Sequence, residues 1–116
     1  MSVLSAWLAA PAPDAAVEIT PDRVAAATLA TRSGGYVIPA YAVEALPAGA
    51  IVPSLTGQNI ADPEAVSAAV RAVVSRLGTR VERVALIVPD VAAKVSLVHF
   101  DTVPPRHDDL DQLVRW

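Results

Sequence analysis

The sequence predicts an α/β fold in which an antiparallel three-strand meander is followed by a helix and then by a buried strand. Short apolar segments separated by turn signals fill residues 15–46, which predicts the meander. Residues 66–77 carry apolar side chains at helical spacing, and residues 84–88 form the continuous apolar run VALIV. At 116 residues, the chain has the length of one domain with one core.

Composition excludes several classes of protein. The chain is 53% hydrophobic and 18% charged, which is typical of globular material rather than of a disordered tail. With a net charge of −3, the chain lacks the excess of basic residues that is typical of nucleic-acid-binding proteins. No cysteine is present, so disulfides and thiol chemistry are excluded, and no apolar run approaches the roughly 20 residues that span a bilayer.

The meander is predicted from its turns. The stretch EITPDRVAAATL predicts a strand over residues 15–19, a tight turn and a second strand over residues 24–31. Residues 33–35 read Ser-Gly-Gly, which favours a tight hairpin because glycine accepts positive φ. Residues 36–46 are predicted to be the third strand, where Pro39 indicates an edge position or an irregularity.

The helix after the irregular connection at residues 47–61 has the clearest signals. Asp62 can cap its N-terminus, Pro63 suits its first turn, and Glu64 complements the dipole. Gly78 stands where a helix commonly ends. One apolar stripe joins Val66, Val70, Val73, Val74 and Leu77.

The C-terminal third predicts three further elements. Residues 84–88 are expected to form a strand buried on both faces. Residues 94–100 are predicted to be another strand, and residues 108–116 a helix that reaches the last residue without a stop signal. We therefore expect the chain to be a fragment, preceded at residues 1–14 by a disordered or loosely packed tail.

Four phrases in this order resemble one family. They are LPAGAI at residues 46–51, DPEA at residues 62–65, VALIVP at residues 84–89 and the final Arg-Trp. Their order and spacing resemble the N-terminal part of the type IV pilus assembly protein PilM family, over roughly residues 15–116. The GspL component of type II secretion has a similar architecture and is the nearest alternative.

The resemblance implies an actin-like, ribonuclease-H-like fold. Residues 15–90 would form the first subdomain, and residues 91–116 the truncated beginning of an inserted subdomain shared with FtsA. It also implies a cytoplasmic protein, peripheral to the bacterial inner membrane, that binds the short cytoplasmic tail of a membrane-anchored partner similar to PilN. As a fragment with an uncovered apolar face, the chain is expected to self-associate through an exposed strand edge.

The first turn is the candidate nucleotide site. The family's first phosphate loop resembles an Asp-Ile-Gly phrase followed by a lysine. Here Glu18 stands at the aspartate and Thr20 at the glycine, while Pro21 removes a backbone donor and Asp22 adds negative charge. Arg23 is the one compensating cation.

These departures predict a degenerate phosphate hairpin at Glu18, Thr20, Asp22 and Arg23, a protein without catalytic activity, and no cofactor. The alternative is an ATPase that binds ATP and Mg²⁺ with Glu18, Thr20 and Arg23 and whose remaining motifs lie beyond Trp116. His99 beside Asp101, and His107 before Asp108, have no recognisable metal-ligand spacing, so no metal site is predicted.

Overall fold

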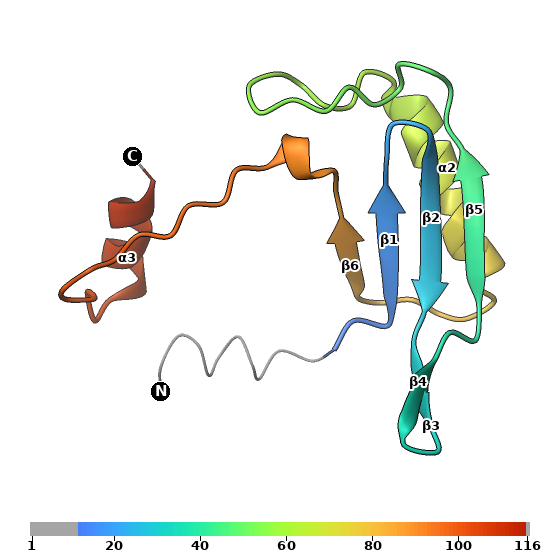
Figure 1. The fold of residues 1–116 in the computed structure, drawn as a ribbon, viewed down its shortest axis with the longest axis horizontal. Coiled ribbons are helices and arrows are strands. Elements are labelled where there is room, and N and C mark those ends of the chain that lie inside the picture. Colours follow the sequence, from blue (N-terminus) through green and yellow to red (C-terminus); the bar gives the residue numbers. More distant parts are fainter. Residues whose placement is uncertain (1–11, 116) are drawn as a thin grey trace.

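A four-stranded sheet forms the centre of the computed structural model, which describes residues 12–115 (Figure 1). Its strands are β1 (Ala15–Ile19), β2 (Arg23–Thr28), β5 (Tyr41–Ala45) and β6 (Val84–Ile87), in the order β5-β2-β1-β6. β1 and β2 are antiparallel, as are β2 and β5, whereas β6 runs parallel to β1. The predicted meander followed by a helix and a further strand is confirmed; residues 1–11 of the predicted tail lie outside the described residues.

The second and third predicted strands are each interrupted. β2 ends at Thr28, and a separate two-stranded sheet follows, formed by β3 (Ala30–Arg32) and β4 (Gly35–Val37). Pro39, which cannot donate to a ladder, lies in the second break, so the predicted irregularity is confirmed but the continuous strands are wrong. We call residues 29–38 the arm, which projects from one end of the sheet (Figure 1).

The arm reverses direction through a two-residue turn. Ser33 has a φ of 51° and Gly34 a φ of 79°, so both central residues are left-handed, as a type I′ turn requires. Arg32 pairs with Gly35 across this turn, which confirms the hairpin predicted from the Ser-Gly-Gly signal.

Helix α2 (Pro63–Arg76) begins and ends as its signals predict. Asp62 Oδ1 accepts a hydrogen bond from the Ala65 backbone N–H at 3.0 Å, and Gly78 has a φ of 67° just beyond the C-cap. α2 packs against β5 and β2. Its buried side chains are Val66, Ala69 and Val73, followed by Leu77 at the C-cap.

The core lies between α2 and one face of the sheet. Side chains alternate along the strands, so Val17, Val24 and Ala26 point toward the helix, and Val24 and Val73 are fully buried. Ile51, from the long connection, joins this core and forms an isolated bridge with Ile60. The connection is therefore anchored to the core at Ile51 and closed on itself by the bridge to Ile60.

β6 is an edge strand rather than a buried one. Leu86 is 61% exposed and Ile87 is 50% exposed, so the prediction of burial on both faces is wrong. The physical reason is coverage: α2 contacts β5 and β2 but does not extend over β6, and no described element packs on its outer side. An apolar run alone cannot tell a central strand from an uncovered edge.

Asp14 fixes the start of β6 to the start of β1. Its Oδ2 accepts hydrogen bonds from the backbone N–H groups of Glu82 and Arg83, each at 2.9 Å, and its own N–H donates to the Arg83 carbonyl at 2.9 Å. Together these bonds set the position from which β6 runs parallel to β1.

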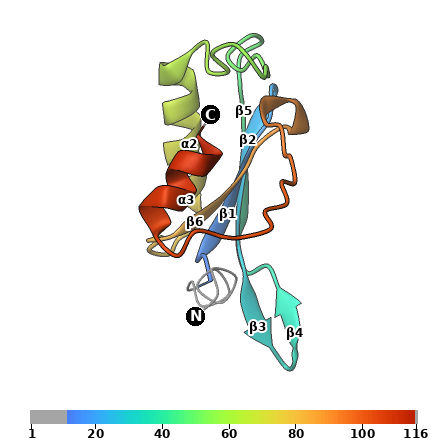
Figure 2. The ribbon, with the colours of Figure 1, turned by 90° about the vertical axis from the view of Figure 1, so that its left-hand side faces the viewer.

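The chain beyond β6 departs from the sheet. A short 3₁₀ turn, η1 (Asp90–Ala92), leads into residues 93–106, which have no strand or helix. The predicted strand at residues 94–100 is wrong: no strand within residues 12–115 pairs with it, and Val95 and Leu97 are 88% and 92% exposed. The predicted C-terminal helix is confirmed as α3 (His107–Val114), which lies away from the sheet (Figure 1) and on the side of the sheet that α2 covers (Figure 2). Trp116 lies outside the described residues.

None of the helices within residues 12–115 combines the length and the apolar character needed to cross a membrane.

Candidate functional site

The turn between β1 and β2 is a tight two-residue hairpin. Ile19 pairs with Val24, and the Thr20 N–H donates to the Arg23 carbonyl at 2.9 Å, which leaves Pro21 and Asp22 as the loop. Neither loop residue has positive φ. This geometry follows from the sequence, because proline presets the φ of the first loop position and aspartate is a common turn residue.

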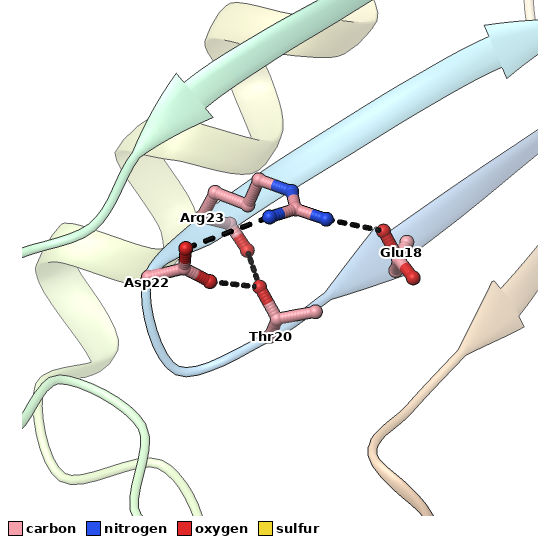
Figure 3. A network of polar contacts seen from close by, with 4 residues as sticks. All are labelled: Glu18, Thr20, Asp22 and Arg23. Atoms are coloured by element: carbon pink, nitrogen blue, oxygen red, sulfur yellow. Dashed lines mark hydrogen bonds and ion pairs between the residues drawn. The ribbon is translucent and has the colours of Figure 1, made fainter.

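The four predicted site residues meet around this turn (Figure 3). The Thr20 hydroxyl donates to Asp22 Oδ1 at 2.7 Å and has the Arg23 carbonyl as a second acceptor at 3.1 Å. The Arg23 guanidinium lies 3.5 Å from Asp22 Oδ2 and 3.7 Å from Glu18 Oε2. The hairpin thus satisfies its own polar groups internally.

The Asp22 carboxylate is stabilised in its ionised form. The hydrogen bond from the Thr20 hydroxyl is the main cause of its lowered pKa, with smaller contributions from its own backbone N–H and from the charge of Arg23. At neutral pH, the turn therefore presents a negative charge at its tip, and one arginine stands between two carboxylates.

The hairpin does not fit a nucleotide phosphate or its magnesium ion. Pro21 has no N–H, and the Thr20 N–H is used in the bond to the Arg23 carbonyl. A phosphate needs converging N–H donors and positive potential, whereas this turn offers an ionised carboxylate. Glu18, the residue at the magnesium-ordering position, is paired with Arg23 instead.

An apolar pocket lies at the same end of the sheet, which we call the loop end. It encloses about 250 Å³ between the ends of β1 and β6 and the long connection. Its walls include Ile19, Ile51, Ile60, Leu86 and Val88. The sequence did not predict this pocket. The one signal for it is that isoleucine and proline recur in the connection, and that composition is also common in ordinary loops.

The polar residues of the long connection shape this pocket. Asn59 Oδ1 accepts from the Ser54 N–H at 2.6 Å, and Ser54 Oγ accepts from the N–H groups of Thr56 and Gly57 at 3.1 and 2.9 Å. Asn59 lines the pocket, but its amide is engaged within the loop. The pocket therefore suits an apolar side chain better than a charged ligand.

Neither histidine lines this pocket. His99 is exposed within the irregular segment that follows η1, and His107 is the first residue of α3. Within residues 12–115, no group of three or more histidine, aspartate or glutamate side chains gathers in a way that could hold a metal ion.

These features define an α/β domain that has, at one end of its sheet, an apolar pocket and a hairpin whose polar side chains contact one another. The family model described as type IV pilus assembly protein PilM matches residues 16–110, and the chain belongs to that family. The resemblance read from the four phrases is thereby confirmed, and the membership links the chain to type IV pilus assembly. A comparison with curated proteins found no match.

Proposed function

We propose that this chain acts as a non-catalytic scaffold in a type IV pilus assembly platform, peripheral to the cytoplasmic face of the inner membrane. The observation that carries the proposal is the β1–β2 hairpin, in which Pro21 has no N–H, the Thr20 N–H is bonded to the Arg23 carbonyl, and the Arg23 side chain lies between two carboxylates. The fold of the whole protein would be actin-like, which the order of three antiparallel strands, helix and strand parallel to β1 supports.

The competing function is that of an actin-like ATPase. It would require the turn to release Arg23 from both carboxylates and to turn an ionised Asp22 away from the phosphate. Each rearrangement breaks a contact that the free protein already makes. Nucleotide binding would therefore have to compensate for the lost contacts of the hairpin. A scaffold needs no such change.

Calorimetric titration of Mg-ATP into the longest product of the gene tests this choice, with Glu18→Ala as the matched variant. The scaffold function predicts no heat at millimolar ATP for either protein. Micromolar binding that Glu18→Ala abolishes would instead make the turn a nucleotide site and favour the ATP-binding alternative.

The scaffold needs a surface for its membrane-anchored partner, and we assign this role to the open edge of β6. Between Arg83 and Pro89, the edge carries only apolar residues and has no lysine, proline or bulge within Val84–Ile87 to block pairing. Its outer side is unpaired among the described residues. An extended cytoplasmic tail would add to it as a strand, with main-chain hydrogen bonds giving affinity.

Binding of a synthetic peptide with the sequence of the partner's cytoplasmic tail tests this surface. Val84→Lys places a charge on the edge while its aliphatic stem keeps contact with the sheet. We expect at least a tenfold loss of affinity, whereas Val91→Lys, at a residue that is also exposed but lies outside the strand, retains binding. Equal binding by both variants would show that β6 is not the docking edge. Tighter binding of a tail peptide from a type II secretion partner would favour the GspL-like alternative.

A further inference from the structure

The arm exposes apolar side chains at the end of the sheet opposite the loop end (Figure 1). Tyr36 is 79% exposed, and Leu29 and Ile38 are each about 60% exposed. A two-stranded hairpin that packs on nothing is marginally stable in water. The arm therefore has the composition of a segment that is covered in the working assembly.

The loop-end pocket is a complementary receptor for such a segment. It is apolar, encloses about 250 Å³ and lies where β1 and β6 end, whereas the arm leaves from the end where β2 finishes. Because the two features lie at opposite ends of one sheet, the arm of a chain cannot reach its own pocket. A second copy, placed end to end, brings arm and pocket together.

Charge also distinguishes the two ends. The loop end carries Glu18 and Asp22 at the hairpin, Asp62 at the start of α2 and Asp90 after β6, and Arg23 is the cation paired with the first two. At the arm end, Arg80 pairs with Glu82 and Arg83 pairs with Asp14, so Arg32 gives this end its positive charge. Opposite ends therefore attract each other, while contact between two loop ends places like charges together.

We propose that copies of this chain associate head to tail, with the arm of one copy seated in the loop-end pocket of the next. Tyr36 and Ile38 supply the apolar contact, and Arg32 faces the acidic residues of the loop end. Such an interface is heterologous, so each copy keeps one arm and one pocket free for a further copy. The contact is small, which makes the association weak and dependent on concentration.

This inference does not depend on the partner proposed for β6, because the arm lies apart from that strand and Val84 lies outside the pocket, which Leu86 and Val88 line. It also differs from edge-to-edge pairing, which joins two identical β6 edges about a two-fold axis. Val84→Lys therefore blocks edge pairing and leaves head-to-tail association intact.

Sedimentation velocity over a range of concentrations tests the proposal. Wild-type protein is expected to show rising mass with concentration, and both Tyr36→Ser and Val88→Lys to weaken association at least tenfold. Both positions are solvent-exposed, so the variants are expected to fold, which circular dichroism checks. Val95→Ser, at an apolar residue that is 88% exposed outside the arm and pocket, is the matched control and should behave as wild type.

Mixing the two variants gives the decisive result. Tyr36→Ser retains a pocket and Val88→Lys retains an arm, so an equimolar mixture should form a 1:1 dimer that does not grow further. Raising the salt concentration should weaken this dimer, because exposed charges are screened. Wild-type monomer at all concentrations, or association that Tyr36→Ser leaves unchanged, would overturn the proposal.

Discussion

The guanidinium of Arg23 lies 3.7 Å from the carboxylate of Glu18, which joins the first two strands diagonally just before the turn (Figure 3). The same guanidinium lies 3.5 Å from Asp22. A sequence reading can treat Arg23 as a cation available to a phosphate. Its position between two carboxylates shows that its charge is already compensated within the hairpin.

This pairing leads to a prediction about stability. Both side chains are nearly half exposed, and exposed ion pairs contribute less than about 1 kcal/mol. A double-mutant cycle with Glu18→Ala and Arg23→Ala, measured by urea unfolding, should give a coupling free energy below that limit. The cycle for Arg76 and Glu44 should give a larger value, because that pair lies at 2.6 Å and Arg76 also binds the Val43 carbonyl. A larger coupling free energy for Glu18 and Arg23 than for Arg76 and Glu44 would contradict this prediction.

A second prediction concerns the start of α2. Asp62→Ala removes the acceptor of the Ala65 N–H and should destabilise the protein by about 1 kcal/mol. Asp62→Asn keeps a capping oxygen and should recover most of the loss. Urea midpoints of the three proteins provide the measurement. Equal destabilisation by both variants would assign the effect to charge rather than to the capping bond.

Local signals predicted the elements whose determinants lie within a few residues. The capping residue Asp62, the stop at Gly78 and the Ser-Gly-Gly turn each act over one turn of chain, and the structure has all three where the sequence places them. The interruption at Pro39 is also set by a local signal, because proline lacks the N–H that a strand ladder needs. The positions of the four hairpin residues also followed from a short strand-turn-strand pattern.

Features that depend on distant parts of the chain could not be predicted in this way. Whether residues 84–88 are buried depends on what covers them, and α2 stops short of β6. Residues 94–100 alternate like a strand but have no neighbour to pair with. The loop-end pocket joins residues from β1, the long connection and β6, so no local pattern encodes it.

The last prediction concerns acid stability and the link between Asp14 and β6. Hydrogen bonds from the backbone N–H groups of Arg83 and Glu82 lower the pKa of Asp14 below the ordinary value of an aspartate. A carboxyl whose pKa is lower in the folded state stabilises the fold above its unfolded pKa, and this contribution is lost as pH falls through the folded pKa. Asp14→Asn should therefore be less stable than wild type at neutral pH, and the difference should shrink below about pH 4. Thermal unfolding from pH 7 to pH 3 measures it, with Asp101→Asn, in the irregular segment after η1, as the control. A difference that stays constant down to pH 3 would show that the Asp14 contact stabilises β6 without its charge.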